Sequence, residues 1–228
     1  MPGNVHPVAN EREGLTGYLA QQRAVLRIAA YGLTEEQARA VPTRSALSVG
    51  GLIKHVSAVE RNWVDIVLQR APAAHDDLEQ RQADYADRFR MGPGETLDGL
   101  LADYEDAARE TDEAIAPLDL ARPVPVPHGV PWFPRDVDAW SVRWVLLHLI
   151  QETARHAGHA DIIREHLDGA TAFELMAAAE GWPATDWLKP WQPPAAGAGE
   201  EGGQDAGSAD RTDSPPAGSG AKAAEGWP

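Results

Sequence analysis

The 228-residue chain contains no cysteine. Without a thiol side chain it cannot form a disulfide, bind zinc through cysteine or use a sulfur of its own as a nucleophile. Any thiol chemistry at this protein would therefore need a small-molecule thiol from outside the chain.

The chain also lacks long apolar runs and an excess of basic residues. No apolar run reaches the roughly 18 residues of a membrane helix, and the N-terminus MPGNVHPVANEREG has no hydrophobic signal-peptide segment. The formal net charge of −15 argues against nucleic-acid binding, because phosphates attract basic surfaces. These absences predict a soluble, cytoplasmic protein with no membrane and no nucleic-acid partner.

Residues 193–228 differ in composition from the rest of the chain. Trp227 is the one large apolar residue among them, and the abundant Gly, Pro, Ala and Ser cannot offset the entropy cost of ordering. We expect a folded domain over 1–192 and a disordered acidic tail over 193–228. The hexapeptide AAEGWP occurs at 178–183 and again at 223–228. The second copy is either a duplication without a role or a tethered copy that docks on its own chain or on a neighbour, which makes a homodimer possible.

The hydrophobic periodicity upstream of the tail is helical almost throughout. Apolar residues recur at three- and four-residue steps in four long segments, at about 11–31, 48–69, 95–118 and 141–168. Ser48 and Ser141 are suitable N-caps. The proline-rich link 121–136 makes one long crossover connection with room for a short hairpin, and a short fifth segment follows at 171–183. The pattern predicts an all-α four-helix bundle with one long crossover connection and a disordered C-terminal tail.

Two polar residues interrupt the apolar face of the last long segment. On a helical wheel of about 100° per residue, Glu152 and His156 fall inside the apolar stripe that contains Leu149. A carboxylate in a bundle core costs on the order of several kcal/mol unless it is paired or coordinates a cation. Because Glu152 and His156 lie one turn apart on one face, they can bind one metal ion together. The alternative is a buried ion pair of Glu152 with Arg143, Arg155 or His156.

A third metal ligand can come from the segment 48–69, where His55 lies on the flank of the apolar stripe. A lone histidine in such a position is more often a satisfied core residue. Together with Glu152 and His156, however, it completes a His/Glu/His set. Such a set leaves coordination positions open, which is typical of catalytic zinc or of non-haem iron.

Two stretches of the sequence resemble a known family. LSVGGLIKHVSAVERNW at 47–63 and RWVLLHLIQETARHAGHADIIREHLDG at 143–169 are similar to the DinB/YfiT superfamily, in particular to its branch with mycothiol-dependent maleylpyruvate isomerase and the mini-circle proteins. The resemblance covers roughly residues 11–190. It implies a four-helix bundle with a divalent metal held by His55, Glu152 and His156. Zinc or nickel is the expected metal, and iron is a further candidate.

The characterised members of this family use low-molecular-weight thiols, mycothiol among them. The resemblance therefore implies a metal-dependent transferase or isomerase that activates such a thiol for attack on an electrophilic substrate. His159, close to His156 on the same helix, would accept a proton or support a ligand, or it is a boundary histidine bonded to water. Two other functions stay open: a non-enzymatic stress protein that binds a metal or a small molecule, and a metal-dependent hydrolase that needs no thiol.

Aromatic residues in and after the proline-rich link are candidates for a substrate pocket. Trp132, Phe133 and Trp140 suit a bundle-capping core as well as they suit a platform for a ligand. Nothing in this segment identifies the electrophile.

Overall fold

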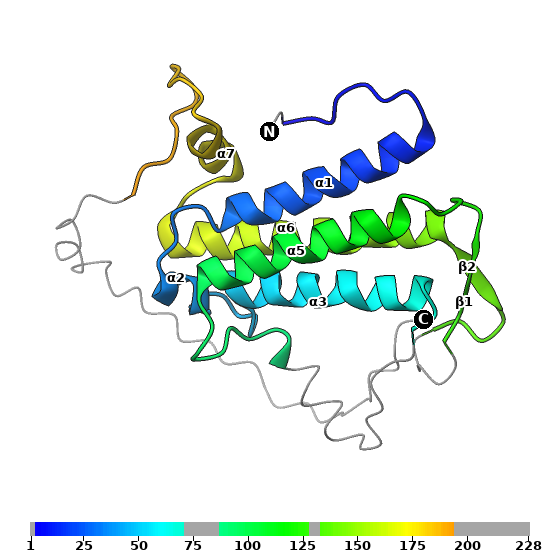
Figure 1. Cartoon of the computed structure of the whole chain (residues 1–228). Helices are drawn as coiled ribbons and strands as arrows, with labels where there is room; N and C mark the ends of the chain where they lie inside the picture. The colour runs from blue at the N-terminus through cyan, green and yellow to red at the C-terminus, as the bar shows by residue number, and fades with distance from the viewer. Residues whose placement is uncertain (1–2, 71–86, 128–132, 194–228) are drawn as a thin grey trace, which may run out of the picture. The chain divides into compact units, whose positions relative to one another are not determined.

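The computed structural model describes residues 3–70, 87–127 and 133–193. Four long helices dominate it and run roughly alongside one another (Figure 1). They are α1 (Glu11–Ala29), α3 (Val49–Val67), α5 (Leu97–Ile115) and α6 (Val142–Asp168). The regular structure of the described residues is completed by two short helices and one two-stranded sheet. The prediction of an all-α four-helix bundle is confirmed.

Each long helix begins after a residue whose side chain caps it. The side chains of Asn10, Ser48, Thr96 and Ser141 each accept a hydrogen bond from the backbone N–H three residues later, which satisfies one of the free donors of the first turn. At the other end of α6, Gly169 adopts the left-handed conformation with φ 77°. The observed helices end up to three residues inside the predicted segments, because the caps themselves are not helical.

Three shorter features connect the long helices. The helix α2 (Glu35–Arg39) has no counterpart among the predicted segments, because five residues are too few to show a period. The helix α7 (Ala172–Glu180) occupies the predicted fifth segment. Between α5 and α6, strand β1 (Pro123–Pro125) pairs antiparallel with β2 (Ala139–Ser141). This pair is the short hairpin for which the sequence leaves room.

The helix α6 packs against α1 and α3, and α3 also packs against α5. Two clusters of buried apolar side chains fill these interfaces. On α6, Leu149 belongs to one cluster and Ala157 belongs to the other. Glu152 and His156 therefore lie between two apolar regions, on the side of the helix that packs.

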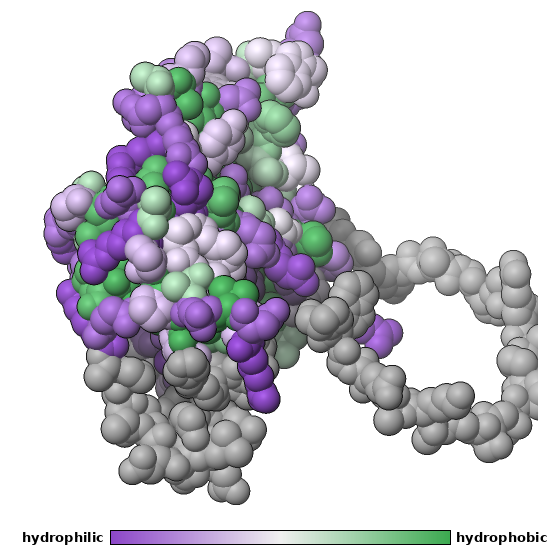
Figure 2. All heavy atoms as spheres, turned by 90° about the vertical axis from the view of Figure 1, so that its right-hand side faces the viewer, coloured by the Kyte–Doolittle hydropathy of each residue, from purple (hydrophilic) through white to green (hydrophobic). Residues whose placement is uncertain are grey.

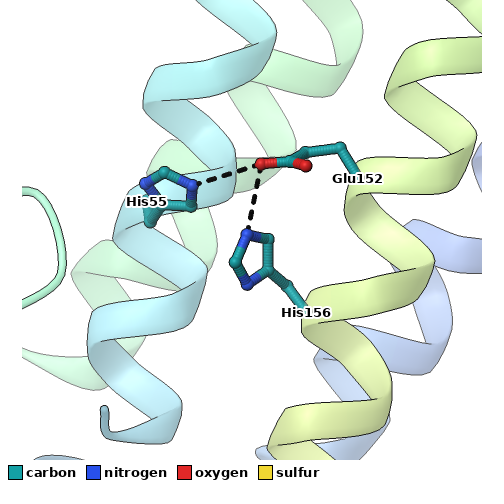
Figure 3. A group of neighbouring side chains, drawn as sticks. All are labelled: His55, Glu152 and His156. Carbon is teal, nitrogen blue, oxygen red and sulfur yellow. Dashed lines mark hydrogen bonds and ion pairs between the residues drawn. The ribbon is translucent and has the colours of Figure 1, made fainter. Parts of the chain in front are cut away.

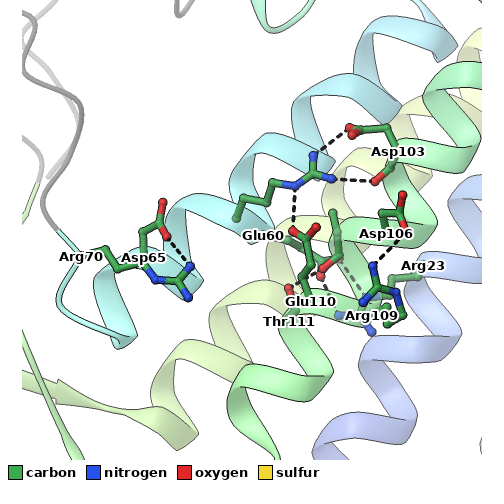
Figure 4. A network of polar contacts seen from close by, with 11 residues as sticks. Arg23, Glu60, Asp65, Arg70, Asp103, Asp106, Arg109, Glu110 and Thr111 are labelled. Carbon is green, nitrogen blue, oxygen red and sulfur yellow. Dashed lines mark hydrogen bonds and ion pairs between the residues drawn. The ribbon is translucent and has the colours of Figure 1, made fainter.

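A buried ion pair joins α1 to α3. Arg23 is 5% exposed and Glu60 is fully buried. Arg23 donates from Nε to Oε1 of Glu60 at 2.9 Å and from Nη2 to Oε2 at 2.6 Å, and its Nη1 donates to Asp112 of α5 at 2.9 Å. Separately, at the surface, Arg61 of α3 donates to Asp103 of α5 at 2.8 Å (Figure 4). Each guanidinium nitrogen of Arg23 and each carboxylate oxygen of Glu60 thus has a partner.

The end of the described chain folds back onto the start of the bundle. The backbone N–H of Trp191 donates to the carbonyl oxygen of Glu174 in α7 at 2.9 Å. Its ring lies against Gly32, where an added Cβ would be 2.5 Å from a ring carbon. The guanidinium of Arg164 in α6 is 4.8 Å from the centre of the same ring. Trp191 therefore ties α7 to the turn that follows α1.

The chain divides into two units, Met1–Gln192 and Pro193–Pro228. Residues 194–228 lie outside the described part, so a disordered tail and a docking role for the repeat at 223–228 stay predictions. No helix in the described part is long and apolar enough to cross a membrane.

Candidate metal centre

Three potential metal ligands meet where α3 packs against α6. His55 comes from α3, and Glu152 and His156 come from successive turns of α6 (Figure 3). One ligand atom of each residue lies within 4.8 Å of those of the other two. Nε2 of His156 is 3.2 Å and Nε2 of His55 is 3.5 Å from the same atom, Oε1 of Glu152. The structure therefore brings together the three residues that the sequence identifies as candidate ligands.

The three side chains differ in their access to solvent. The side chain of His55 is 5% exposed, whereas those of His156 and Glu152 are 14% and 23% exposed. The amphipathic faces explain this difference. His55 lies on the packed side of α3, whereas Glu152 and His156 lie at the border of the packed side of α6. The cluster is thus closed on the side of α3 and open along α6.

The charge of the cluster is set by Glu152. Hydrogen bonds, first to His156 and then to His55, hold the pKa of this carboxyl well below its usual range, although burial acts in the opposite direction. Glu152 is therefore an anion at neutral pH, as a ligand of a cation must be. One turn earlier on α6, burial lowers the pKa of His148, so that this ring is neutral at the same pH.

Phe89 covers one face of His55. The two rings are stacked, with centroids 3.8 Å apart and planes 18° apart. The backbone at Phe89 approaches α3 closely, because a Cβ added to Gly51 would be 2.0 Å from the carbonyl oxygen of Phe89. Lys54 donates to the carbonyl oxygen of Arg90 at 3.1 Å and so holds the same segment in place. The sequence has no signal for this contact, since Phe89 lies outside every periodic segment.

A row of aromatic rings lies next to the three ligands. Trp140, Trp144 and His148 follow one another at intervals of four residues. The rings of Trp140 and Trp144 are 4.7 Å and 7° apart, and those of Trp144 and His148 are 5.3 Å and 2° apart. Trp63 of α3 meets the row at a steeper angle, with its ring centre 4.7 Å from that of His148. The three stacked residues are called the aromatic row below.

The remaining predicted residues lie apart from the ligand cluster. His159 is partly buried on α6 and does not belong to the group formed with His156, so its role stays a prediction. Phe133 packs against Trp63, with ring centres 5.9 Å apart, in one of the apolar clusters. Trp132 lies outside the described residues.

The three ligands fit one divalent cation. Two imidazole nitrogens and one carboxylate oxygen are a donor set of open zinc sites and of non-haem iron sites. Ligand atoms about 2.1 Å from a tetrahedral ion lie roughly 3.4 Å from one another. The distances from Oε1 of Glu152 to the two histidine nitrogens are 3.2 and 3.5 Å, and the three ligand atoms all lie within 4.8 Å of one another. In the described part of the chain no fourth His, Asp or Glu joins the group.

One comparison with known proteins identifies the family of the chain. Residues 14–169 match the family model of the mycothiol S-transferases. The matched region contains His55, Glu152 and His156, and it is more than half of the chain. No curated protein sequence matches the chain. The match confirms the resemblance to the DinB/YfiT-like proteins, and the chain belongs to the mycothiol S-transferase family.

Proposed function

We propose that this protein is a metal-dependent transferase, or an isomerase of related chemistry, that joins the sulfur of a low-molecular-weight thiol to an electrophilic substrate. The observation that carries the proposal is the convergence of His55 and His156 on one oxygen of Glu152. Membership of the family supports mycothiol as the thiol. The absence of cysteine supports a sulfur nucleophile that comes from outside the chain.

His55, Glu152 and His156 would hold the cation, which we propose to be zinc or nickel, with iron as the alternative. When bound, such a cation lowers the pKa of a thiol and makes its sulfur a nucleophile at neutral pH. Glu152 contributes the negative charge that offsets the cation. The exposed fractions of Glu152 and His156 leave an approach for the thiol from the side of α6.

The chain's own residues would also manage the proton that the thiol loses. We propose His159 as the acceptor, because it lies close to His156 on α6 and is partly exposed. An imidazole is a side chain suited to accept a proton and release it to solvent. The sulfur then forms a bond to the electrophilic carbon, and the leaving group departs with its electron pair.

The proposal is tested by metal analysis and a transfer assay on the same protein preparation. We expect one metal ion per chain, and conjugation of mycothiol to chlorodinitrobenzene that a chelator abolishes and added metal restores. His55→Ala and His156→Ala should lose both properties. His166→Ala is the matched control, because His166 is an exposed histidine on the same helix as His156, and its Nδ1 hydrogen-bonds to the carbonyl oxygen of Ile162.

Two outcomes would favour the other functions. Metal-dependent turnover of an ester or amide without any thiol would point to a hydrolase. A bound metal without turnover of any electrophile, in the presence of mycothiol, would point to a non-enzymatic binding protein. The presence of a bound metal distinguishes the hydrolase and the metal-binding protein from a structural ion pair at Glu152, which would hold no metal.

A further inference from the structure

The aromatic row points along α6 to the candidate metal ligands. Trp140, Trp144, His148, Glu152 and His156 follow one another at intervals of four residues. Because four residues make about one helical turn, the members of this series on α6 share one stripe of the helix. Trp140 belongs to β2 and continues the row because its ring stacks on that of Trp144. We propose that the aromatic row is a shelf on which planar, conjugated electrophiles stack beside the metal. This inference rests on the proposed function, because it names the class of substrate that the thiol would attack.

The orientation of the rings supports a stacking site next to Glu152. The rings of Trp144 and His148 are 2° from parallel, and the residues are one turn apart on α6. The face of His148 that is turned away from Trp144 is therefore directed toward the following turn, which carries Glu152. Within the described residues, the other ring in contact with His148 is Trp63, whose plane is inclined by 59°. A further planar group added to the row would lie at the metal ligands.

The row is held in place without a ligand. Trp63 is 5% exposed and contacts all three rings of the row, at centroid distances of 5.3 Å for Trp140, 5.5 Å for Trp144 and 4.7 Å for His148. Trp144 nevertheless remains 38% exposed, and the neighbouring Leu147 is 50% exposed. At the hairpin end of the bundle, where the row begins, green and near-white residues lie among the purple charged ones (Figure 2). The shelf is thus preorganised and reachable from solvent.

The chemistry of the row selects the class of electrophile. Aromatic rings prefer offset stacking on other planar π systems, and an electron-poor ring is a good partner for an electron-rich indole. With chlorodinitrobenzene, the sulfur of the thiol forms a bond to the ring carbon and the carbon–chlorine bond breaks. Chloride leaves with the electron pair and the thiol proton passes to the acceptor. The row takes no part in these bond changes and acts by holding the ring of the substrate.

A selectivity measurement tests the shelf on the full chain loaded with metal. Chlorodinitrobenzene is compared with iodoacetamide, a compact aliphatic electrophile, with mycothiol as the thiol. The measured quantity is kcat/KM for chlorodinitrobenzene divided by kcat/KM for iodoacetamide. Trp144→Leu and His148→Leu should each lower this ratio by about two- to tenfold. His148→Phe keeps a ring and should keep the ratio, which separates stacking from proton transfer. Leu147→Ala, next to the row on the exposed side, should leave it unchanged.

A binding measurement gives a readout that needs no turnover. Dinitrobenzene lacks the leaving group, and its stacking quenches tryptophan fluorescence. Saturable quenching should be present in the wild type, retained in His148→Phe and weakened in His148→Leu, with circular dichroism to confirm that the variants fold. Trp144→Leu is used in the kinetic test, where it gives a second variant of the row at a partly exposed position.

The two measurements distinguish failure of the shelf from failure of the proposed function. Quenching that depends on His148 in a protein without transferase activity would support the shelf and remove the thiol transfer. Thiol transfer with an unchanged selectivity ratio in Trp144→Leu and His148→Leu would keep the proposed function and overturn the shelf. Equal losses for both electrophiles would overturn it as well.

Discussion

Two carboxylates lie inside the same bundle and are compensated in different ways. Glu60 is fully buried, and Arg23 donates to both of its oxygens. The side chain of Glu152 is 23% exposed, and one of its oxygens faces both His55 and His156. The first arrangement contains its own cation, whereas the second has an anion and two bases that bind either protons or a metal ion. A closed ion pair supports the fold, and an open one can take a ligand.

This difference has an energetic consequence. Removal of Arg23 would leave a fully buried charge without its main partner, which is expensive because the interior cannot solvate it. Removal of the charge of Glu152 would leave no obligatory charge behind, because an imidazole, unlike a guanidinium, can be neutral in a protein. The same type of change should therefore affect stability at one site and ligand binding at the other.

The largest effect on stability is expected at the closed pair. Arg23→Met should lower the free energy of unfolding by about 3–5 kcal/mol, because Glu60 is then buried without a cation. Arg61→Met is the matched control, since Arg61 pairs with Asp103 and Glu110 at the surface, and it should cost about 1 kcal/mol or less. Urea denaturation of both variants measures the difference. Similar costs for the two would show that burial does not distinguish the pairs.

Glu152→Gln should weaken metal binding strongly. Mutation of residues that only hydrogen-bond to a metal ligand lowers affinity by roughly 10–100-fold, and the loss of a charged ligand should exceed this. The amide keeps the volume of the side chain and removes its charge, so the metal-free protein should lose less than about 1 kcal/mol of stability. Metal titration and thermal melts with and without chelator measure the two quantities. An equal loss of melting temperature in chelated and metal-loaded protein would instead identify Glu152 as half of a structural ion pair.

A smaller effect on the metal is expected at Phe89. Phe89→Leu removes the ring stacked on His55 and should lower metal affinity by about tenfold, because the imidazole is then free to turn. Met91→Leu changes a buried residue of the same segment with little change of volume and serves as the control. Competition with a chromophoric chelator gives both affinities. Identical affinities in the two variants would show that Phe89 is packing alone.

The smallest effect concerns a third carboxylate, Asp161 of α6. Burial and then the charge of Glu165 raise its pKa to about 6. Because the folded protein holds this proton more tightly than the unfolded chain, stability falls as pH rises from about 4 to 6 and stays lowered above that range. Asp161→Asn should therefore stabilise the protein at pH 7, by about 1 kcal/mol or less after solvent screening, and bring no gain near pH 4. Urea denaturation at the two pH values tests this, and an equal gain at both would contradict it.

The sequence was sufficient to predict the long helices and to identify Glu152 and His156 as candidate ligands on α6. Apolar residues at helical spacing are a local signal, and Glu152 and His156 stand out because charge on an apolar stripe is costly. His55 could be assigned only through its combination with that pair. The family resemblance then implied a thiol as substrate, which the spacing of the residues does not indicate.

Other parts of the site depend on contacts that no local pattern encodes. Phe89 reaches His55 from a segment between helices, and Arg23 meets Glu60 across thirty-seven positions of the chain. Trp140 and Trp144 have a visible four-residue spacing, but their nearly parallel planes depend on side-chain rotations that packing decides. Such features are set by tertiary structure and become visible in the assembled bundle.

The contact between Trp191 and Gly32 matters for anyone who shortens this protein. The family match ends at residue 169, but the ring that fills the space beside Gly32 belongs to residue 191. A chain cut at the limit of sequence similarity would expose that turn and leave the guanidinium of Arg164 without the aromatic face above it. Homology alone would thus place the cut in the wrong position. A shortened version of this protein should therefore keep the chain through Trp191.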